Sequence, residues 1–209
     1  ASTETMSGTV RIAASEVVSA YVLPPMIARL GEAEPSIEIE IVASNQVENL
    51  LRRDADIAIR MVEPAQQDLI ARRVTDIALC ACAAVSYLDR RGRPASIEEL
   101  PDRDLIGFDR DSTIIDAFGA LGIRLDRHAF RFRADNQIVG WEAVRAGNGI
   151  GFGQLPLAVR DPSVEVILPG MPLPALPVWL AMHRDVRTSA RIRRVVDFLF
   201  AELKRYADV

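Results

Sequence analysis

The stretch at residues 54–62, Asp-Ala-Asp-Ile-Ala-Ile-Arg-Met-Val, decides the fold. It is a short, nearly continuous apolar run that begins with two acids and reaches an arginine, Arg60. Such a run is typical of a strand buried on both faces, as in a parallel sheet covered by helices. Ligands of open α/β sheets bind beyond the carboxyl ends of the strands, where Arg60 would stand. Its guanidinium could hold a small carboxylate through two hydrogen bonds, and a simple ion pair at the sheet rim explains it equally well.

Two more strands are predicted before this stretch, at residues 9–14 and 37–42, where apolar residues alternate with polar ones. Helices are expected at residues 17–30, where Pro24 and Pro25 disturb the first turns, and at 47–53. An order of strand, helix, strand, helix, strand implies parallel pairing with right-handed crossovers. The carboxyl ends of the three strands would then bring together one group of residues: Ser15 with Val17, Ser44 with Asn45, and Arg60 with Met61.

Ser15 precedes the first predicted helix and is expected to cap it. A helix start also presents free backbone N–H groups to an anion. Capping and ligand binding are compatible, so the sequence leaves both roles open for Ser15.

The remaining chain continues the alternation of strands and helices. Strands are expected at residues 76–84, 105–108, 130–134, 150–153, 164–168 and 177–183, and helices at 96–100, 113–121, 137–146 and 190–206. The runs at 76–84 and 177–183 are long enough to leave one lobe and enter another. Asn136 is expected to cap the helix at 137–146. The glycines near residue 151 lack the context of a phosphate-binding loop.

Bulk properties exclude several classes of protein. The chain has 209 residues, 49% hydrophobic, with a net charge of −4 and scattered arginines, which argues against nucleic-acid binding by this piece alone. No apolar run approaches the roughly 20 residues of a membrane span, and no secretory signal is visible. Cys80 and Cys82 are expected to be buried thiols in a reducing compartment. His128 and His183 stand alone, so neither a metal nor a cofactor is expected.

Four stretches carry a resemblance to a known family: residues 8–15, 55–60, 145–151 and 179–193. In this order and with these separations they resemble the effector-binding domain of LysR-type transcriptional regulators, over nearly all of residues 8–203. The resemblance implies an α/β fold of two Rossmann-like lobes joined by two crossing strands, like type 2 periplasmic binding proteins. Lobe I would hold residues 1–81 and 180–209, and lobe II residues 82–179. The family's N-terminal winged helix-turn-helix is expected to be absent from this chain.

By position, the family's effector pocket would lie between the lobes. Ser15, Ser44 and Arg60 match its positions in the first lobe, and the second lobe would contribute Phe108, Asp109, Asn136 and Gln154. Charges of both signs at residues 109–111 also make an effector with an amino group conceivable.

The resemblance further implies a cytoplasmic homodimer or homotetramer that binds a small-molecule effector and meets DNA only through the missing domain. The first helix would pack against another subunit, and Val18, Tyr21 and Val22 offer apolar surface there, although they could equally belong to the lobe's own core. Two alternatives differ in class. A solute-binding protein of a transport system would share the fold. An enzyme would need a nucleophile–base pair or paired acids in the cleft, and the sequence marks none, so no catalytic residue is expected.

Overall fold

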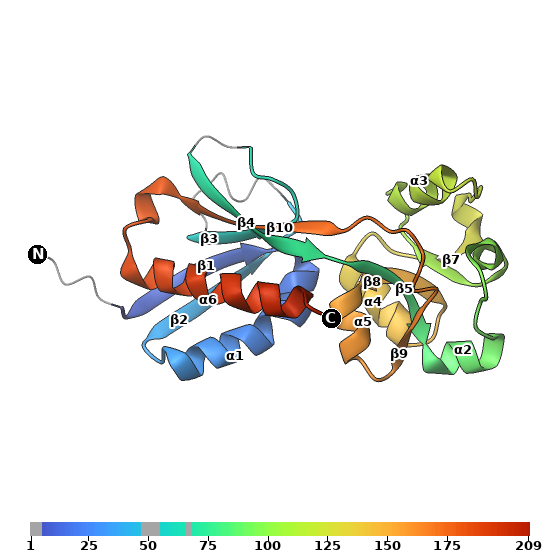
Figure 1. The fold of residues 1–209 in the computed structure, drawn as a ribbon, viewed down its shortest axis with the longest axis horizontal. Helices are drawn as coiled ribbons and strands as arrows, with labels where there is room; N and C mark the ends of the chain where they lie inside the picture. The colour runs from blue at the N-terminus through green and yellow to red at the C-terminus, as the bar shows by residue number, and fades with distance from the viewer. Residues whose placement is uncertain (1–5, 47–54, 66–67) are drawn as a thin grey trace, which may run out of the picture. The chain divides into compact units, whose positions relative to one another are not determined.

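The computed structural model describes residues 6–46, 55–65 and 68–209. The chain forms two compact units, each built around a five-stranded mixed sheet (Figure 1). Unit 1 combines the residues up to Ile77 with Ala175–Asp208, and unit 2 comprises Ala78–Pro174. The predicted helix at residues 47–53 lies outside the described residues.

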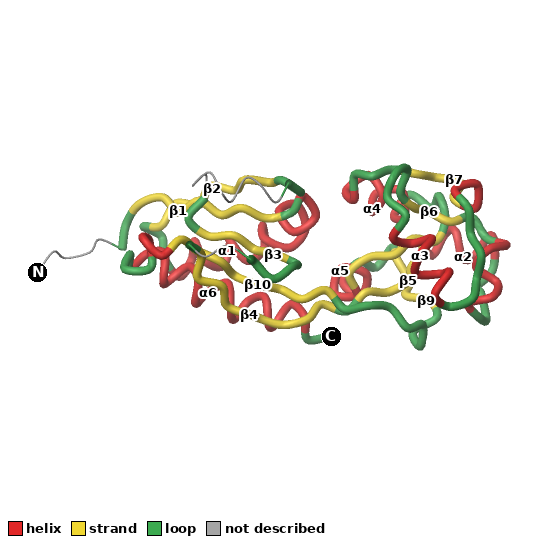
Figure 2. Tube along the Cα trace, turned by 90° about the horizontal axis from the view of Figure 1, so that it is seen from above, coloured by secondary structure: helices red, strands yellow, loops and turns green. Residues whose placement is uncertain are grey.

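The sheet of unit 1 has the strand order β2-β1-β3-β10-β4 (Figure 2). Its strands are β1 (Gly8–Ala14), β2 (Ile37–Ala43), β3 (Ile57–Arg60), β4 (Leu69–Ile77) and β10 (Leu176–His183). β1 pairs in parallel with both β2 and β3, as the alternation of strands and helices predicts. All four residues of β3 are buried, which confirms a buried strand for residues 57–60 of the run at 54–62. Residue 54 lies outside the described residues.

The helices of unit 1 are a π-helix, η1 (Val18–Val22), followed directly by α1 (Leu23–Ala33), then the short 3-10 turn η5 (Arg184–Val186) and α6 (Ala190–Ala207). Pro24 and Pro25 lie in the first turn of α1, directly after Leu23. Because proline has no N–H to donate to the preceding turn, the wider π-helical turn before α1 is the local result. Val18 and Val22 are buried within this unit. These two valines therefore belong to the core of the unit, whereas Tyr21 is half-buried. Packing of the first helix against another subunit stays a prediction.

The sheet of unit 2 has the order β7-β6-β8-β5-β9. Its strands are β5 (Leu79–Ala84), β6 (Leu105–Gly107), β7 (Phe130–Arg133), β8 (Ile150–Gln154) and β9 (Val164–Ile167). Its helices are α2 (Val85–Arg91), α3 (Thr113–Ala120), α4 (Gln137–Arg145) and α5 (Leu155–Arg160), with 3-10 turns η3 (Ile97–Asp102) and η4 (Arg127–Ala129). Its core includes Tyr87, Phe118 and Phe130.

Gly151 shows why glycines crowd β8. A Cβ built there would lie 2.5 Å from Cγ2 of Val144 on α4, so only glycine lets that helix pack so closely. This packing role agrees with the inference that these glycines do not form a phosphate-binding loop.

Two expectations need correction. The run at residues 76–84 is two strands rather than one, because β4 ends at Ile77 and β5 begins at Leu79. The units accordingly divide after Ile77 and after Pro174, not after residues 81 and 179. Strand pairing explains both shifts: Leu79 already pairs with Gln154 of unit 2, and Leu176 already pairs with Ile77 of unit 1.

Candidate functional site: the carboxyl edge of the unit 1 sheet

Three predicted site residues lie side by side at the carboxyl edge of the unit 1 sheet. Ala14 pairs with Ala43, so the next residues along β1 and β2 are Ser15 and Ser44. Ala13 pairs with Ala58, so two residues further along these parallel strands Ser15 is level with Arg60. A hydrogen bond of 2.9 Å from Ser44 N to the Ala14 carbonyl extends the pairing to this edge. The parallel register therefore brings two hydroxyl-bearing residues and a guanidinium to neighbouring positions.

Arg60 is buried, with 8% of its surface exposed. Its Nε has no hydrogen-bond partner, and no described residue forms a hydrogen bond or an ion pair with this side chain. Burial lowers the pKa of the guanidinium because the charged form loses its hydration. A buried charge without a partner is costly, and the described residues supply no such partner to Arg60. This disfavours the interpretation of Arg60 as one half of a rim ion pair.

The side chain of Arg60 is directed to one face of the sheet by the strand register. Arg60 stands opposite Trp179 of β10, and Ala58 stands opposite Ala181. Residues directly opposite one another in an antiparallel pair share a face. Ala58 and Ala181 belong to a cluster of small buried side chains on this face, together with Ala13. Trp179 is a neighbour that the sequence analysis missed, since only the pairing of β10 with β3 reveals it.

The turn after β1 supports the site through Ser15. Its Oγ accepts a long hydrogen bond of 3.4 Å from Val18 N, so the predicted capping role is present, though weak. Val17 is buried beside it, with 8% of its surface exposed. Met61 follows Arg60 directly and is half-buried.

The turn after β2 is held to the turn after β1 by Asn45. Its Oδ1 accepts a hydrogen bond of 3.1 Å from Glu16 N, and its Nδ2 donates one of 3.2 Å to Oε2 of Glu16. Ser44 Oγ accepts a hydrogen bond of 3.1 Å from Gln46 N. Asn45 thus acts as a positioning residue in this structure. Glu16, its partner, was missed because nothing in the local sequence links residues 16 and 45.

In unit 2, hydrogen bonds to the side chain of Asp135 hold the loop that carries Phe108 and Asp109. Oδ1 of Asp135 accepts hydrogen bonds of 2.9 Å from the backbone N of both Asp109 and Arg110. These bonds, the one from Arg110 first, hold the pKa of the Asp135 carboxyl below its usual range. Asp109 itself is paired with Arg127, Nη2 to Oδ1, at 2.9 Å. Its carboxylate is therefore already compensated.

The two other predicted residues of unit 2 are also engaged in the fold. Oδ1 of Asn136 accepts a hydrogen bond of 3.1 Å from Val139 N and caps α4, as predicted. Gln154 is buried at the end of β8, with 7% of its surface exposed, and is not free of partners. The structure groups Phe108 and Asp109 in one loop of this unit, and it gives Asn136 and Gln154 positions at helix starts.

A family model described as the LysR substrate binding domain matches residues 3–204. The chain belongs to this family. A curated relative is the HTH-type transcriptional regulator CrgA of Neisseria meningitidis serogroup C, 31% identical over 105 residues, half of this chain and 35% of that protein. Another is the HTH-type transcriptional activator AaeR of Escherichia coli, 22% identical over 199 residues, 92% of this chain and 64% of that protein. The chain thus spans about a third to two thirds of the length of these relatives.

Among solved structures, the regulatory domain of CrgA, a LysR-type transcriptional regulator from Neisseria meningitidis, matches with a TM-score of 0.80 and 24% identity. The match covers 94% of this chain and 99% of that domain. The LysR domain described here therefore has the two-lobed α/β fold of LysR regulatory domains, the type 2 periplasmic-binding-protein-like fold.

The cysteines of this LysR domain lie in the core of unit 2. Cys80 and Cys82 are buried, unpaired by any disulfide, and hydrogen-bonded to each other. That bond lowers the pKa of Cys80, whereas the same bond and burial raise the pKa of Cys82. Across residues 6–46, 55–65 and 68–209, no group of three metal-ligating side chains comes together. Over the same ranges, no helix has the length and apolar character needed to span a membrane.

Proposed function

We propose that this LysR domain senses a small carboxylate-bearing molecule, and that the carboxyl edge of the unit 1 sheet holds its carboxylate. The observation that carries the proposal is the buried guanidinium of Arg60, whose Nε lacks a partner. A bidentate bond to a carboxylate would supply the missing hydrogen bonds and the missing negative charge at once. Ser15 lies one strand away and would add a hydroxyl donor.

The groups at the unit 1 edge narrow the chemistry of the ligand. Arg60 supplies a cation and Ser15 a hydroxyl, both of which suit a carboxylate. The acid described beside them, Glu16, accepts a hydrogen bond from Asn45. We therefore propose a simple carboxylate rather than an amino acid. We propose that Phe108, Asp109, Asn136 and Gln154 complete the pocket, as the family resemblance implies, by shaping its wall.

Regulation would follow from unequal affinity. A ligand shifts an equilibrium between two arrangements only by the difference of its binding free energies to them. We propose that the carboxylate favours the arrangement in which unit 2 closes over the edge, and that closure changes the packing of a homodimer or homotetramer. DNA would be contacted by a helix-turn-helix domain of the full-length protein, in the cytoplasm.

Two other functions receive less support. A solute-binding protein of a transport system would use the same fold, but the relatives are named transcriptional regulators. An enzyme would need a nucleophile–base pair, and the polar groups described at the Arg60 edge are two hydroxyls, a guanidinium, an amide and a carboxylate bound to that amide. We therefore propose a binding role without catalysis.

The test is thermal unfolding of the chain in the presence of small aliphatic carboxylates, aromatic acids, amino acids and the matching neutral amides. A ligand at 100 times its dissociation constant adds about 2.7 kcal/mol of stability, which raises the Tm by several degrees for a protein of this size. We expect at least one carboxylate to raise the Tm and its amide to leave it unchanged. A folded protein whose Tm responds equally to acid and amide, or to no acid at all, would contradict the proposal.

A further inference from the structure

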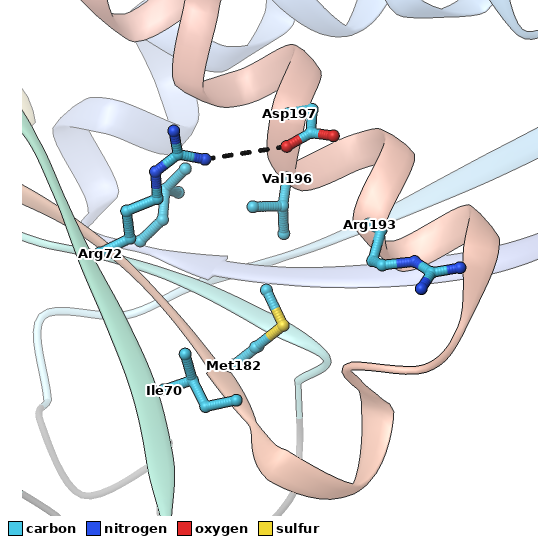
Figure 3. Close-up of a pocket in the computed structure, with 7 residues that line it drawn as sticks. Ile70, Arg72, Met182, Arg193, Val196 and Asp197 are labelled. Carbon is cyan, nitrogen blue, oxygen red and sulfur yellow. Dashed lines mark ion pairs between the residues drawn. The ribbon is translucent and has the colours of Figure 1, made fainter.

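A separate pocket of about 200 Å³ opens in unit 1 between the sheet and α6 (Figure 3). Its floor is apolar and comes from three elements: Ile70 on β4, Leu180 and Met182 on β10, and Val196 on α6. Pockets for drug-sized ligands run to about 300–1,000 Å³, so this one suits a smaller molecule. The floor requires that this molecule have a compact apolar body.

This pocket lies on the face of the sheet opposite to Arg60. Leu180 pairs with Ile59 and with Arg72, so these three residues share a face. Arg60 pairs with Trp179, the next residue along β10, and successive residues of a strand point to opposite faces. The pocket is therefore distinct from the candidate anion site.

At the rim of the pocket, Arg72 is a cation that could exchange its acidic partner for a ligand. Nη1 of Arg72 lies 3.8 Å from Oδ1 of Asp197, beyond ordinary hydrogen-bond distance, and both side chains are more than half exposed. Exposed pairs of this kind contribute little to stability. The Arg72 guanidinium is also held over the ring of Phe200, with Cζ 3.7 Å from the ring centre. Stacking on Phe200 thus fixes the position of Arg72, while its ion pair with Asp197 is weak.

The charged residues that line the pocket are Arg72, Arg193 and one acid, Asp197. Arg193 makes an interaction of its own, so Arg72 is the cation that the lining offers to a ligand. Figure 3 shows the Arg193 guanidinium extending away from Asp197, which leaves Arg72 as the cation at the mouth.

We propose that this pocket is a second small-molecule site, which takes a compact monocarboxylic acid with an apolar tail. The tail would lie on Ile70, Met182 and Val196, and the carboxylate would replace Asp197 as the partner of Arg72. Because the Arg72–Asp197 pair is long and exposed, its loss costs little, while a bidentate bond to a carboxylate is stronger.

Each of the two sites has one methionine whose methyl NMR signal can report ligand binding. Met182 lines this pocket, and Met61 follows Arg60 at the other site. Hexanoate is the probe, followed through the methyl signals of ¹³C-methionine in the intact 209-residue chain. We expect a saturable shift of the Met182 signal with a dissociation constant on the order of millimolar, as suits a ligand of about eight non-hydrogen atoms.

Variants that remove a charge at the rim should change the affinity for hexanoate in opposite directions. Arg72→Gln and the neutral probe hexanamide should each weaken binding at Met182 by about fivefold to tenfold. Asp197→Asn should tighten it, because the competing carboxylate is gone. Arg73→Gln is the matched control, since Arg73 is the adjacent, equally exposed arginine of β4 and pairs with Asp76 at Oδ1, 2.5 Å away. It should leave the Met182 titration unchanged.

The same titration also tests whether the two sites bind independently of each other. Arg60→Met should leave the hexanoate titration at Met182 unchanged. Three results would overturn the proposal: no saturable shift at Met182, equal binding of hexanoate and hexanamide, or loss of the Met182 response in Arg60→Met. An Asp197→Asn variant that binds more weakly would overturn the role given to Arg72.

Discussion

The two sheets of this LysR domain differ in how the charged residues at their edges are compensated. At the carboxyl edge of unit 1, the Arg60 guanidinium is buried and its Nε has no partner. At the edge of unit 2, Asp135 accepts two backbone N–H groups and Asp109 is paired with Arg127. The first edge holds a buried charge that is not compensated by the residues described, whereas the second compensates its charges internally. Binding capacity follows from what the fold leaves unsatisfied, so polar residues at a strand end are not by themselves a binding site.

The largest effect is expected from removing the charge of Arg60. Arg60→Met keeps an apolar stem and deletes the guanidinium, so a carboxylate held at this edge loses its buried ionic partner. Truncating one partner of a buried hydrogen-bonded charge pair costs about 2–5 kcal/mol, and we expect the affinity for that carboxylate to fall at least about 30-fold. Titration calorimetry with the most stabilising acid measures it. A loss below threefold would place the anion elsewhere.

Glu202 provides the compensated counterpart of Arg60 within the same unit. This carboxylate is buried, yet Oε2 lies 2.6 Å from Nη2 of Arg29 and Oε1 lies 3.0 Å from Nη1 of Arg205. We expect Glu202→Gln to lower the free energy of unfolding by about 1–3 kcal/mol at neutral pH, measured by urea denaturation. An unchanged free energy would show that pairing of a buried charge does not matter in this unit.

The stabilising effect of Glu202 should depend on pH in a defined direction. The hydrogen bond from Arg29, and then the charges of Arg29 and Arg205, hold the pKa of Glu202 below its usual range. A depressed pKa means that the contribution is complete above the unfolded-state pKa of about 4.3 and is lost as the pH falls through the lower folded-state value. The difference in stability between wild type and Glu202→Gln should therefore shrink as the pH is lowered below about 4.

Asn136 tests the claim that the unit 2 edge is already satisfied. Asn136→Ala removes the acceptor that caps α4, and loss of such a cap costs about 0.5–2 kcal/mol of stability. Because the side chain is used by the helix, we expect carboxylate affinity to change by less than about twofold. Chemical denaturation and calorimetry on the same sample separate the two effects. A loss of affinity at unchanged stability would mean that Asn136 bonds the ligand directly, and does not only shape the wall of the pocket.

Ser15 should give the smallest change. Its capping bond to Val18 N is long, at 3.4 Å, so Ser15→Ala should hardly affect stability. A lost hydrogen bond to the ligand is worth about 0.5–1.5 kcal/mol, and we expect affinity to fall about threefold to tenfold. Calorimetry with the same acid provides the number, and an unchanged affinity would leave Ser15 as a cap alone.

Local patterns predicted the parallel strands of unit 1 and the position of Arg60 at a strand end, whereas the two-lobed fold was inferred from the family resemblance. The buried run at 54–62 predicted both the central strand and the position of Arg60 at its end, because burial and strand alternation are properties of neighbouring residues. The break at Ala78 was missed because β4 and β5 adjoin with only one residue between them. The first half of β4 was not predicted because it contains the charged residues Arg72 and Arg73. β4 is an edge strand, and these residues are exposed to solvent.

Compensation of charges could not be predicted in this way. Asp135 approaches the backbone of Asp109 from 26 residues away, and Asn45 reaches Glu16 across 29 residues. Such contacts depend on tertiary packing, which no spacing in the sequence encodes. The same limit hid the pocket under α6, whose rim pairs Arg72 with Asp197.

The central claim, that Arg60 is a buried charge that waits for an anion, is tested most directly by urea unfolding of wild type and Arg60→Met, each with and without the stabilising carboxylate. Without ligand, we expect Arg60→Met to be more stable by about 1–2 kcal/mol, because an uncompensated buried charge has been removed. With saturating ligand, we expect the order to reverse. A ligand-free Arg60→Met variant that is less stable than wild type would contradict the account.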